Sequence, residues 1–456
     1  MTQLARENLS GTQSQAAAVI VIGAGVGGLQ TACKLQQAGI SCLVLEPSGQ
    51  ICGQAFSNNF SVEHHPRTHA LATGLGLVDG LRSVQGKATL ESFAAFEHDQ
   101  QPALDAEDAA SLVKVKTILD TLSLRRDDPQ RDVDMTVEQL VSSCGATDTV
   151  AEMANLWTRT IFGLSSNNVS ASQFLSQCDS CGGLGPVLDN MYGLGDNLAV
   201  PELSHQIATA MAQHLSSRSL HLNQEVDRVE HGDENTCIIY TKSGNVFHGN
   251  KIVLAGSLSS CSSLDIAPPP AAVAPWETMK EEQGFSTTVD IVFDHPWWQQ
   301  RGLSGHAQGL TGPIAQVRPS GLIATDGLYA LSCQVAGEQA RGMWLWLMSD
   351  EEREMLLVQH LSAIFGGAIP RAVQVVERDQ DALVSGQQSL HLAGENAGQR
   401  GRHRWTSEGN VHFAGADTSH VWRGYLEGAL VAGERAAAEI MAVVGAAKPM
   451  EMAPRL

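Results

Sequence analysis

The sequence predicts an α/β protein with two domains that interleave along the chain. Three observations support this: a strand that meets a glycine-rich turn near the N-terminus, a second strand–glycine–helix pattern near the C-terminus, and a length of 456 residues, which suits two or three domain-sized units. The first pattern is the most specific. Val19 to Ile22 are all apolar, and a GxGxxG turn then places glycines at Gly23, Gly25 and Gly28.

A helix and a second strand follow this turn. The spacing of apolar residues from Leu29 to Ala38 predicts the helix. The apolar run from Ile40 to Leu45 predicts the strand, and it ends at Glu46, eighteen residues after Gly28. Strand, glycine turn, helix, strand and acid in this order are the fingerprint of a dinucleotide-binding, Rossmann-like domain.

Each part of this fingerprint has a physical task. Gly23 permits the tight turn, Gly25 lets the backbone approach a pyrophosphate, and Gly28 lets the helix pack closely on the strand. The helix N-terminus offers unpaired N–H groups to the phosphates. The carboxylate of Glu46 can accept hydrogen bonds from a ribose diol.

The C-terminal pattern repeats the placement of a helix N-terminus after a strand. Val411 to Ala414 predict the strand, Gly415 ends it, Asp417 supplies an acid, and a helix is predicted from about Gly424. One face of that helix is apolar at spacings of four and three residues, and it carries Leu426, Leu430, Gly433, Ala437 and Ile440.

This C-terminal segment resembles the flavin motif of the flavin-containing amine oxidase family. The matching residues are Phe413, Ala414, Gly415, Trp422, Gly424, Tyr425, Glu427, Gly428 and Ala429. Asp417 stands where the family has Glu. The resemblance implies a two-domain flavoprotein, with a GxGxxG FAD-binding domain and an interleaved α+β substrate domain, and it implies FAD as the cofactor.

The resemblance also assigns roles to C-terminal residues. Trp422 and Tyr425 are expected to flank the flavin, with Tyr425 as one wall of an aromatic cage that favours an amine. Gly415, Asp417 and Leu426 complete the C-terminal set of predicted cofactor-binding residues. Ordinary packing at a helix start is the alternative interpretation of Tyr425.

A third match lies in the middle of the chain. Pro201 suits the first turn of a helix. Ile238 to Tyr240, a Ser243-Gly244 turn and Ile252 to Ala255 predict a β-meander. In the family this segment contains a valine whose backbone meets the adenine, and Val226 is the matching position.

The resemblance implies the following division of the chain. The FAD-binding domain takes residues 16–75, 200–260 and 396–446, the substrate domain takes 76–199 and 261–395, and mobile tails take 1–15 and 447–456. In the substrate domain, the residue patterns predict helices over 108–124, 136–144, 149–162 and 350–365, and strands over 287–293 and 343–347.

Three departures from the family are informative. Gln54 occupies the position of an arginine that normally faces the pyrophosphate. Thr288 occupies the position of a lysine that many amine oxidases hold near the flavin. Residues 394–409 contain no counterpart of the cysteine that binds flavin covalently in monoamine oxidases. The sequence therefore predicts noncovalent FAD and a substrate that is specialised, as in secondary metabolism.

The densest histidine cluster follows Glu63. In the family, this segment passes beside the flavin ring, so we expect His64 and His65 to converge on the ring with Thr288 and Tyr425. If the reaction needs a base, one of these two histidines is the best candidate, because histidine has an unperturbed pKa near 6.5. A polar surface loop is the alternative interpretation.

Composition narrows the classes of partner. A formal net charge of −20 argues against nucleic acid as a ligand. No run reaches the roughly 18–20 apolar residues of a membrane span, and the polar N-terminus lacks the pattern of a secretory signal. We therefore expect a cytoplasmic protein. A peroxisomal location is a weaker alternative, from the C-terminal Pro-Arg-Leu.

The nine cysteines are expected to stay reduced in a cytosolic protein. Cys178 and Cys181 form one CxxC motif, which leaves inert thiols, a redox pair or a metal site as alternatives. A zinc site would need a second pair or histidines at suitable spacing, and none follows closely, so no metal is predicted.

The sequence thus predicts an FAD-dependent oxidoreductase of the amine oxidase type. A small-molecule substrate would lose a hydride, from a carbon next to nitrogen, to noncovalent FAD, and oxygen would be the acceptor. Two alternatives stay open: a redox-neutral flavoenzyme such as an isomerase or cyclase, and a catalytically inactive flavoprotein subunit. The sequence does not predict the oligomeric state.

Overall fold

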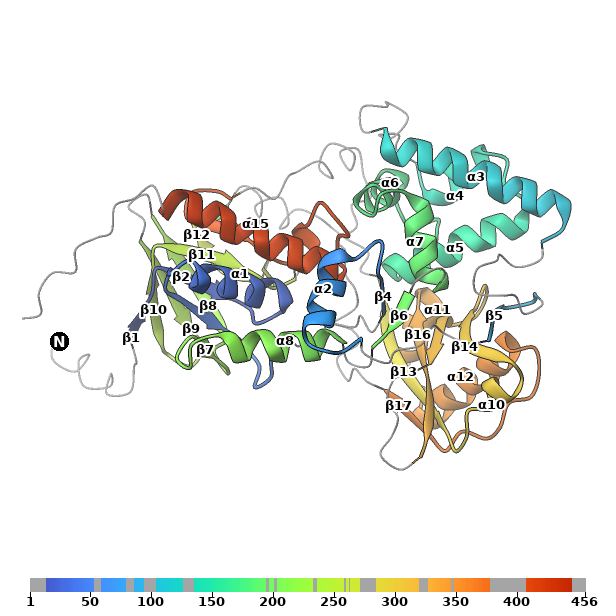
Figure 1. Cartoon of the computed structure of the whole chain (residues 1–456). Coiled ribbons are helices and arrows are strands. Elements are labelled where there is room, and N and C mark those ends of the chain that lie inside the picture. Colours follow the sequence, from blue (N-terminus) through green and yellow to red (C-terminus); the bar gives the residue numbers. More distant parts are fainter. Residues whose placement is uncertain are drawn as a thin grey trace, which may run out of the picture. The chain divides into compact units, whose positions relative to one another are not determined.

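A computed structural model gives the fold of the chain (Figure 1). It describes residues 14–52, 59–78, 86–93, 104–125, 135–193, 197–200, 203–232, 236–257, 260–261, 263–270, 284–319, 327–345, 348–377 and 407–444. These residues belong to two compact units. Unit 1 lies within Met1–Phe56, Ser204–Met279 and Arg404–Leu456, and unit 2 lies within Ser57–Leu203 and Lys280–His403.

The units divide the chain at different positions from the predicted domains. Residues 57–75 were predicted with the FAD-binding domain, but they belong to unit 2. The reason is strand β4 (Asn59–Ser61), which pairs with β6 (Asn197–Ala199) of the same unit. Residues 261–279 were predicted with the substrate domain, but they belong to unit 1, where β12 (Asp265–Ala267) pairs with β8.

A five-stranded parallel sheet forms the centre of unit 1, in the order β18-β11-β2-β3-β7. Its strands are β2 (Val19–Ile22), β3 (Cys42–Leu45), β7 (Leu220–His221), β11 (Lys251–Leu254) and β18 (Val411–Phe413). All but β7 are buried at every residue, as expected for parallel strands covered on both faces. The predicted strands at both ends of the chain are therefore confirmed.

Two helices from opposite ends of the chain pack together beside this sheet: α1 (Val26–Gln37) and α15 (Leu426–Val444) (Figure 1). Glycines allow their backbones to meet. A Cβ atom at Gly27 would overlap the carbonyl oxygen of Ala414, and one at Gly433 would lie 2.5 Å from the carbonyl oxygen of Gly27. The helices thus approach more closely than larger side chains would permit.

A second five-stranded sheet, in the order β1-β10-β9-β8-β12, completes unit 1. Its other strands are β1 (Ser14–Ala16), β8 (Val226–His231), β9 (Cys237–Thr241) and β10 (Val246–Gly249). One apolar cluster joins side chains of both sheets, among them Ile20, Leu45, Val229, Ile239 and Phe413. Helix α8 (Leu203–His214) precedes β7.

Two predictions about this sheet were wrong. Residues 252–255 were predicted to complete the meander, but β11 lies between β2 and β18 of the parallel sheet, because Ile252, Val253 and Leu254 are apolar in succession and require burial on both faces. Residues 14–15 were predicted to be part of a mobile tail, but they belong to β1, whose residues pair with Val246–His248 of β10.

Unit 2 contains a six-stranded sheet in the order β17-β13-β16-β15-β14-β5. Its strands are β5 (Lys87–Leu90), β13 (Ser286–Phe293), β14 (Leu303–Gln308), β15 (Ile314–Pro319), β16 (Tyr329–Ala336) and β17 (Gln374–Glu377). The strand predicted at 287–293 corresponds to β13. Neighbouring side chains along each strand point to opposite faces, and the two faces of this sheet differ in character.

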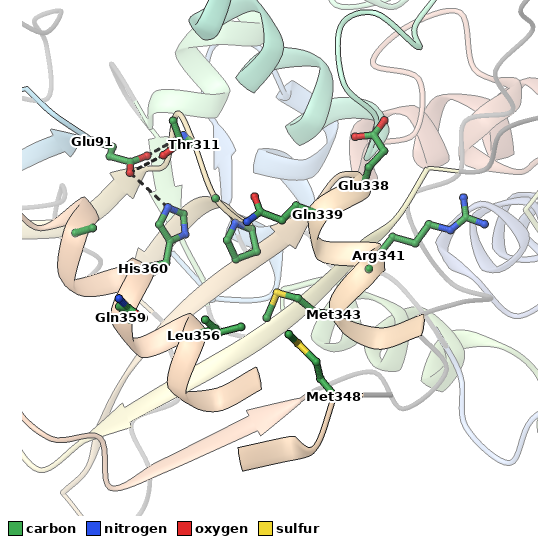
Figure 2. Close-up of a pocket in the computed structure, with 14 residues that line it drawn as sticks. Glu91, Thr311, Glu338, Gln339, Arg341, Met343, Met348, Leu356, Gln359 and His360 are labelled. Carbon is green, nitrogen blue, oxygen red and sulfur yellow. Dashed lines mark hydrogen bonds and ion pairs between the residues drawn. The ribbon is translucent and has the colours of Figure 1, made fainter. Parts of the chain in front are cut away.

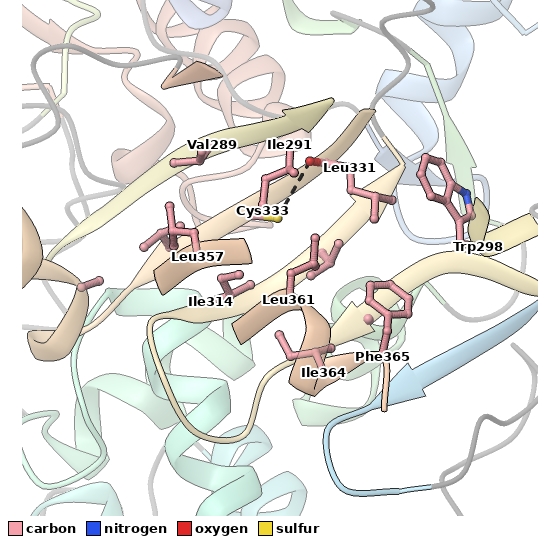
Figure 3. Packing of buried hydrophobic residues seen from close by; sticks show 14 of the residues in the cluster. Val289, Ile291, Trp298, Ile314, Leu331, Cys333, Leu357, Leu361, Ile364 and Phe365 are labelled. Carbon is pink, nitrogen blue, oxygen red and sulfur yellow. Dashed lines mark hydrogen bonds between the residues drawn. The ribbon is translucent and has the colours of Figure 1, made fainter. Parts of the chain in front are cut away.

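One face of the sheet carries the core of unit 2 (Figure 3). Val289, Ile291 and Phe293 of β13 pack there against α12 (Asp350–Ile364). Residues of α10 (Trp297–Gln300) and α11 (Glu338–Leu345) join the same apolar cluster. The rings of Phe293, Trp297, Trp298 and Phe365 meet edge to face, an arrangement that aromatic quadrupoles favour.

The opposite face is polar and binds helix ends. Gln308 and Gln316 donate to the carbonyl oxygen of Met191, and Arg318 donates to that of Asn190 at 3.2 Å. Both carbonyls lie in the last turn of α7 (Leu184–Tyr192), where no intrahelical donor remains. Gln334 donates in the same way to Thr160 of α5. Side chains of the sheet thus satisfy the carbonyl ends of two helices.

Four helices of unit 2 begin close to the predicted positions: α3 (Ala106–Leu124), α4 (Val137–Ser143), α5 (Asp148–Phe162) and α12. Two others, α2 (Pro66–Gly74) and α6 (Ala171–Ser180), were not predicted. Thr136 and Ser349 form capping boxes at the starts of α4 and α12. None of the helices in the described ranges combines the length and apolar character that a membrane crossing requires.

The strand predicted at 343–347 is wrong for the residues described. Met343 and Trp344 belong to α11, and Trp346 and Leu347 lie outside the described residues. The alternation of tryptophan and leucine suggested a strand, but the residues before it decide the outcome. Ala340, Met343 and Trp344 pack on the core at spacings of three and four residues, which is helical periodicity.

A buried carboxylate joins β5 to α12 through a histidine. Glu91 accepts hydrogen bonds from the N–H and hydroxyl of Thr311 at 2.8 and 2.9 Å, and Nε2 of His360 lies 3.6 Å from its Oε1. His360 also accepts the N–H of Ile314 on Nδ1. Burial acts to raise the pKa of Glu91, but His360 and Thr311 outweigh it and lower this pKa to about 2.

This cluster predicts a contribution to stability that depends on pH. Because the folded-state pKa is below the ordinary value of 4.5, the contribution is complete above pH 4.5 and is lost as pH falls towards 2. The difference between these pKa values corresponds to about 3 kcal/mol. We expect Glu91→Gln to lower the thermal midpoint at pH 7 and to differ less from wild type as the pH falls through this range.

Thermal unfolding at a series of pH values checks this expectation. Glu354→Gln, on the exposed side of α12, is the matched control. A constant difference between Glu91→Gln and wild type from pH 7 to pH 3 would contradict the assignment.

Candidate functional site

The glycine turn of unit 1 leaves space beside the start of α1. Gly23 has a φ of +108°, and its N–H donates to the carbonyl of Leu45 at 2.8 Å. Gly25 caps α1 without a side-chain hydrogen bond, and among the described residues a Cβ atom there would meet only the carbonyl oxygen of Ala255, at 3.8 Å. At Gly28, a Cβ atom would overlap the carbonyl oxygen of Gly23.

The three glycines therefore differ in function. Gly28 is required by packing, and Gly23 by its left-handed backbone. At Gly25, neither packing nor backbone conformation requires glycine, because its φ of −69° suits any residue. The open space at a helix N-terminus is what a pyrophosphate needs, so this turn fits the predicted dinucleotide.

Glu46 lies directly after β3 and is 8% exposed. Its Oε2 accepts the N–H of Ala24 at 2.8 Å, and its Oε1 accepts the N–H and hydroxyl of Ser48 at 3.2 and 2.8 Å. An ionised carboxylate has about four acceptor positions, so one remains for a ribose hydroxyl. The sequence did not predict that Glu46 also fixes the glycine turn.

The C-terminal turn approaches the loop that follows β11. Gly415 precedes the short 3₁₀ helix η3 (Ala416–Thr418), and a Cβ atom at Gly415 would overlap the carbonyl oxygen of Gly256. Burial raises the pKa of Cys261 to about 12, and the nearby Asp417 carboxylate adds to this increase. Asp417 therefore lies close to the end of β11, where the carboxyl ends of parallel strands bind ligands in such folds.

The two predicted aromatic residues form a pair at the start of α15. The rings of Trp422 and Tyr425 meet edge to face, with centroids 5.1 Å apart and planes at 87°. Trp422 is buried and has a φ of 46°. A Cβ atom at Gly428 would overlap the carbonyl oxygen of Trp422. Leu426, the first residue of α15, is also buried.

Of the two further predicted cofactor residues, one lies among the described residues and one does not. Val226 is the first residue of β8 and is buried in the cluster between the two sheets of unit 1. Gln54 lies outside the described residues. No contact of a cofactor with either residue has been tested, so both remain predictions.

The histidine pair lies in unit 2, between β4 and α2. The backbone N–H of Ser61 donates to Nδ1 of His65 at 2.9 Å, and the N–H of His64 donates to the hydroxyl of Ser61 at 3.0 Å. A neutral imidazole has one donor nitrogen and one acceptor nitrogen. His65 is therefore fixed in the tautomer with its proton on Nε2.

His64 has a different environment. Its ring is half-buried, whereas His65 is 3% exposed. Burial raises the pKa of Asp189 on α7, and Lys116 and His64 act against that increase. His64 thus lies within electrostatic reach of a carboxylate, and the structure distinguishes two histidines that the sequence left equivalent.

Thr288 is half-buried on the polar face of the six-stranded sheet, opposite Gln334 of β16. Asp290 lies on the same face two residues later and is 3% exposed. Asp290 was not predicted from the sequence, where the available signal was a charged residue between the apolar residues Val289 and Ile291. Tyr425 belongs to unit 1, so the expected convergence of the histidines, Thr288 and Tyr425 on one ring stays a prediction.

One cavity of about 860 Å³ lies in unit 2 between α11 and α12 (Figure 2). Two carboxylates, Glu91 and Glu338, line it. Glu91 is bonded to Thr311 and faces His360, as Figure 2 shows, and Glu338 accepts hydrogen bonds from Ser165 and Asn168. Its carboxylates are therefore already hydrogen-bonded within the protein, and we do not assign it as the active site.

Cys178 and Cys181 are both buried at the C-terminal end of α6. A helix C-terminus carries partial negative charge, which disfavours a thiolate. This position favours the interpretation as inert thiols over a redox pair. Among the described residues, no group of three or more His, Cys, Asp or Glu side chains could hold a metal ion.

The glycine turn yields a prediction with a matched pair of variants. Gly25→Ala should fold normally and bind FAD at least 10-fold more weakly, because the methyl group occupies the space left for the pyrophosphate. Gly27→Ala should lower the thermal midpoint, since overpacking costs about 1–3 kcal/mol, more than the roughly 1 kcal/mol that alanine gains over glycine in a helix.

Titration of the apoprotein with FAD and thermal unfolding check both variants. Equal FAD affinity in wild type and Gly25→Ala would show that this turn does not hold the pyrophosphate.

Comparisons with known proteins agree with this geometry. The sequence profile of the family described as "flavin containing amine oxidoreductase" matches residues 26–441. The chain is 23% identical to the probable flavin-containing monoamine oxidase A of Dictyostelium discoideum, over 92% of this chain and 97% of that protein. It is 24% identical to amine oxidase [flavin-containing] B of Mus musculus, over 94% of this chain and 86% of that protein.

Two solved structures share the fold. Wild-type putrescine oxidase bound to putrescine matches with a TM-score of 0.83 and 21% identity, over 94% of this chain and 100% of that chain. Cyclohexylamine oxidase from Brevibacterium oxydans IH-35A matches with a TM-score of 0.81 and 23% identity, over 94% and 99%. The predicted fold class and the predicted FAD cofactor are confirmed. The chain belongs to the flavin containing amine oxidoreductase family, and it is an FAD-dependent oxidoreductase with a small-molecule substrate.

Proposed function

We propose that this enzyme oxidises a small amine at the carbon next to nitrogen and passes the electrons to oxygen. The observation that carries the proposal is the fit between the family and the turn at Gly25, where space remains at a helix N-terminus beside a fixed carboxylate. Relatives named as monoamine oxidases and a fold neighbour named as putrescine oxidase support an amine as the substrate class.

Bound FAD supplies a two-electron acceptor for a hydride from the substrate. The protein's part is to hold the cofactor and to present the amine. Glu46 and the glycine turn would bind the ribose and the pyrophosphate. The edge-to-face pair of Trp422 and Tyr425 is a rigid aromatic surface, and a ring face attracts an amine through its quadrupole.

A protonated amine is a poor hydride donor, so the substrate nitrogen must be neutral before oxidation. We assign removal of this proton to His64 rather than to His65. His65 uses its Nδ1 lone pair for the N–H of Ser61 and carries its proton on Nε2, so it has no acceptor nitrogen available. His65 is suited instead to hold the loop and to donate a hydrogen bond.

Thr288 occupies the position of the family lysine, and it cannot replace an amine base, because its hydroxyl does not titrate near neutral pH. Asp290, two residues later on the same polar face, is a buried carboxylate. The absent lysine favours a substrate different from that of a simple monoamine oxidase.

Anaerobic mixing with a panel of amines tests the proposed reaction. We expect at least one monoamine or diamine to bleach the visible absorption of the flavin, and oxygen to restore it with one peroxide formed per amine oxidised. Bleaching without formation of peroxide would indicate that the electron acceptor is not oxygen. Turnover of an amine with no bleaching at any stage would favour the redox-neutral alternative.

Variants of the two histidines should differ in the rate of flavin reduction. His64→Ala should slow flavin reduction roughly 10²–10⁴-fold, the usual contribution of a positioned base, with FAD affinity unchanged. His65→Asn should cost less, because its amide can still accept the N–H of Ser61. Stopped-flow reduction rates measure both. A larger loss in His65→Asn than in His64→Ala would reverse the assignment.

A further inference from the structure

The turn after β18 is held by hydrogen bonds within it and by one side chain from outside it. Thr418 donates its N–H and its hydroxyl to the carbonyl of Gly415, at 2.9 and 2.7 Å. The N–H of Gly424 donates to the carbonyl of Ala416 at 3.1 Å. This turn carries Gly415 and Asp417, two of the predicted FAD-binding residues. The carbonyl oxygens of Phe413 and Thr418, at its two ends, need donors from elsewhere.

Arg435, two and a half helical turns into α15, supplies those donors. Its NH2 group donates to the carbonyl of Phe413 at 2.8 Å and to the hydroxyl of Thr418 at 3.0 Å. Its NH1 group donates to the carbonyl of Thr418 at 2.6 Å. One guanidinium therefore bridges both ends of the turn, which a lysine ammonium cannot do with the same fixed fork.

A carboxylate and a buried histidine orient this guanidinium. Oε1 of Glu439, one helical turn later, lies 3.6 Å from Nε of Arg435. Oε2 of Glu439 lies 3.0 Å from Nδ1 of His412, whose side chain is only 2% exposed on β18. His412, Glu439 and Arg435 thus form a chain that starts on the strand and returns to the turn at the end of that strand.

Burial lowers the pKa of Arg435 more than its partner Glu439 raises it. Arginine keeps its proton throughout the range in which proteins are stable. The charge therefore persists at the turn, where it can strengthen each of the three hydrogen bonds.

We infer that Arg435 is a positioning residue that holds the Gly415–Thr418 turn in the shape that binds FAD, and that Glu439 and His412 orient it. The inference rests on the prediction that this turn meets the cofactor. Arg435 contacts Phe413, Thr418 and Glu439. Its effect is on cofactor affinity and not on the chemical step.

Titration of the apoprotein with FAD, followed by flavin fluorescence, tests the inference with four variants. Losing charge-assisted bonds should weaken FAD binding roughly 10- to 100-fold in Arg435→Ala. Arg435→Lys should recover part of this loss, and Glu439→Ala should lie between Arg435→Ala and wild type. Arg228→Ala is the matched control, because Arg228 is a half-exposed arginine of the same unit that pairs with Glu230 and Asp265.

Two further readouts separate positioning from general stability. Millimolar guanidinium should restore FAD affinity in Arg435→Ala, whereas sodium at the same concentration should not. The rate of flavin reduction by substrate, measured at saturating FAD, should stay within about twofold of wild type, because Arg435 is not assigned to the chemistry. If Arg435→Ala does not fold, Glu439→Ala and Arg435→Lys still report the effect on FAD affinity.

Asp417→Asn tests the premise separately. If this variant and Arg435→Ala both bind FAD as tightly as wild type, the turn does not meet the cofactor and the inference fails with its premise. If Asp417→Asn weakens binding and the Arg435 and Glu439 variants do not, the turn binds FAD without the clamp and the inference alone fails. An equal loss in Arg228→Ala would also overturn it.

Discussion

Unit 1 depends on the close approach of backbone to backbone at three turns that are far apart in the sequence. Gly28 lets α1 cross the turn at Gly23, Gly27 lets it meet Ala414 after β18, and Gly415 lets that turn meet Gly256 after β11. A single methyl group at any of these contacts would overlap a carbonyl oxygen or neighbouring chain. The ends of β2, β11 and β18 can therefore lie close together only because glycine stands at each of these contacts. The open space beside Gly25 lies at the same edge of the sheet.

Polar side chains then fix what the glycines bring together. Glu46 links the end of β3 to the glycine turn through the N–H of Ala24. Arg435 links α15 to both ends of the turn after β18. Each is a charged group, held in a largely buried place by backbone partners, and such bonds are stronger than neutral ones. A cofactor site formed in this way is preorganised, because its backbone donors are positioned before any ligand arrives.

Unit 2 follows a different principle, in which one sheet has two unlike faces. Its apolar face holds the aromatic and aliphatic core, and its polar face satisfies the carbonyl ends of α5 and α7. Thr288 and Asp290 lie on that polar face because they alternate with the core residues Val289 and Ile291. The same alternation that makes the strand stable therefore presents polar groups on the side away from the core.

The sequence by itself determined the elements whose signals are local. The GxGxxG turn, the strands at both ends of the chain, the starts of α4 and α12 and the family motif at Trp422 and Tyr425 all depend on neighbours within a few residues. Only the tertiary structure decided that β11 joins the parallel sheet, which of two competing patterns holds at Met343 and Trp344, and that His64 and His65 differ. The reason is physical. The strands that pair with β11 lie far away in the sequence, packing on the core selects the helical pattern of α11, and the N–H of Ser61 fixes the tautomer of His65 alone.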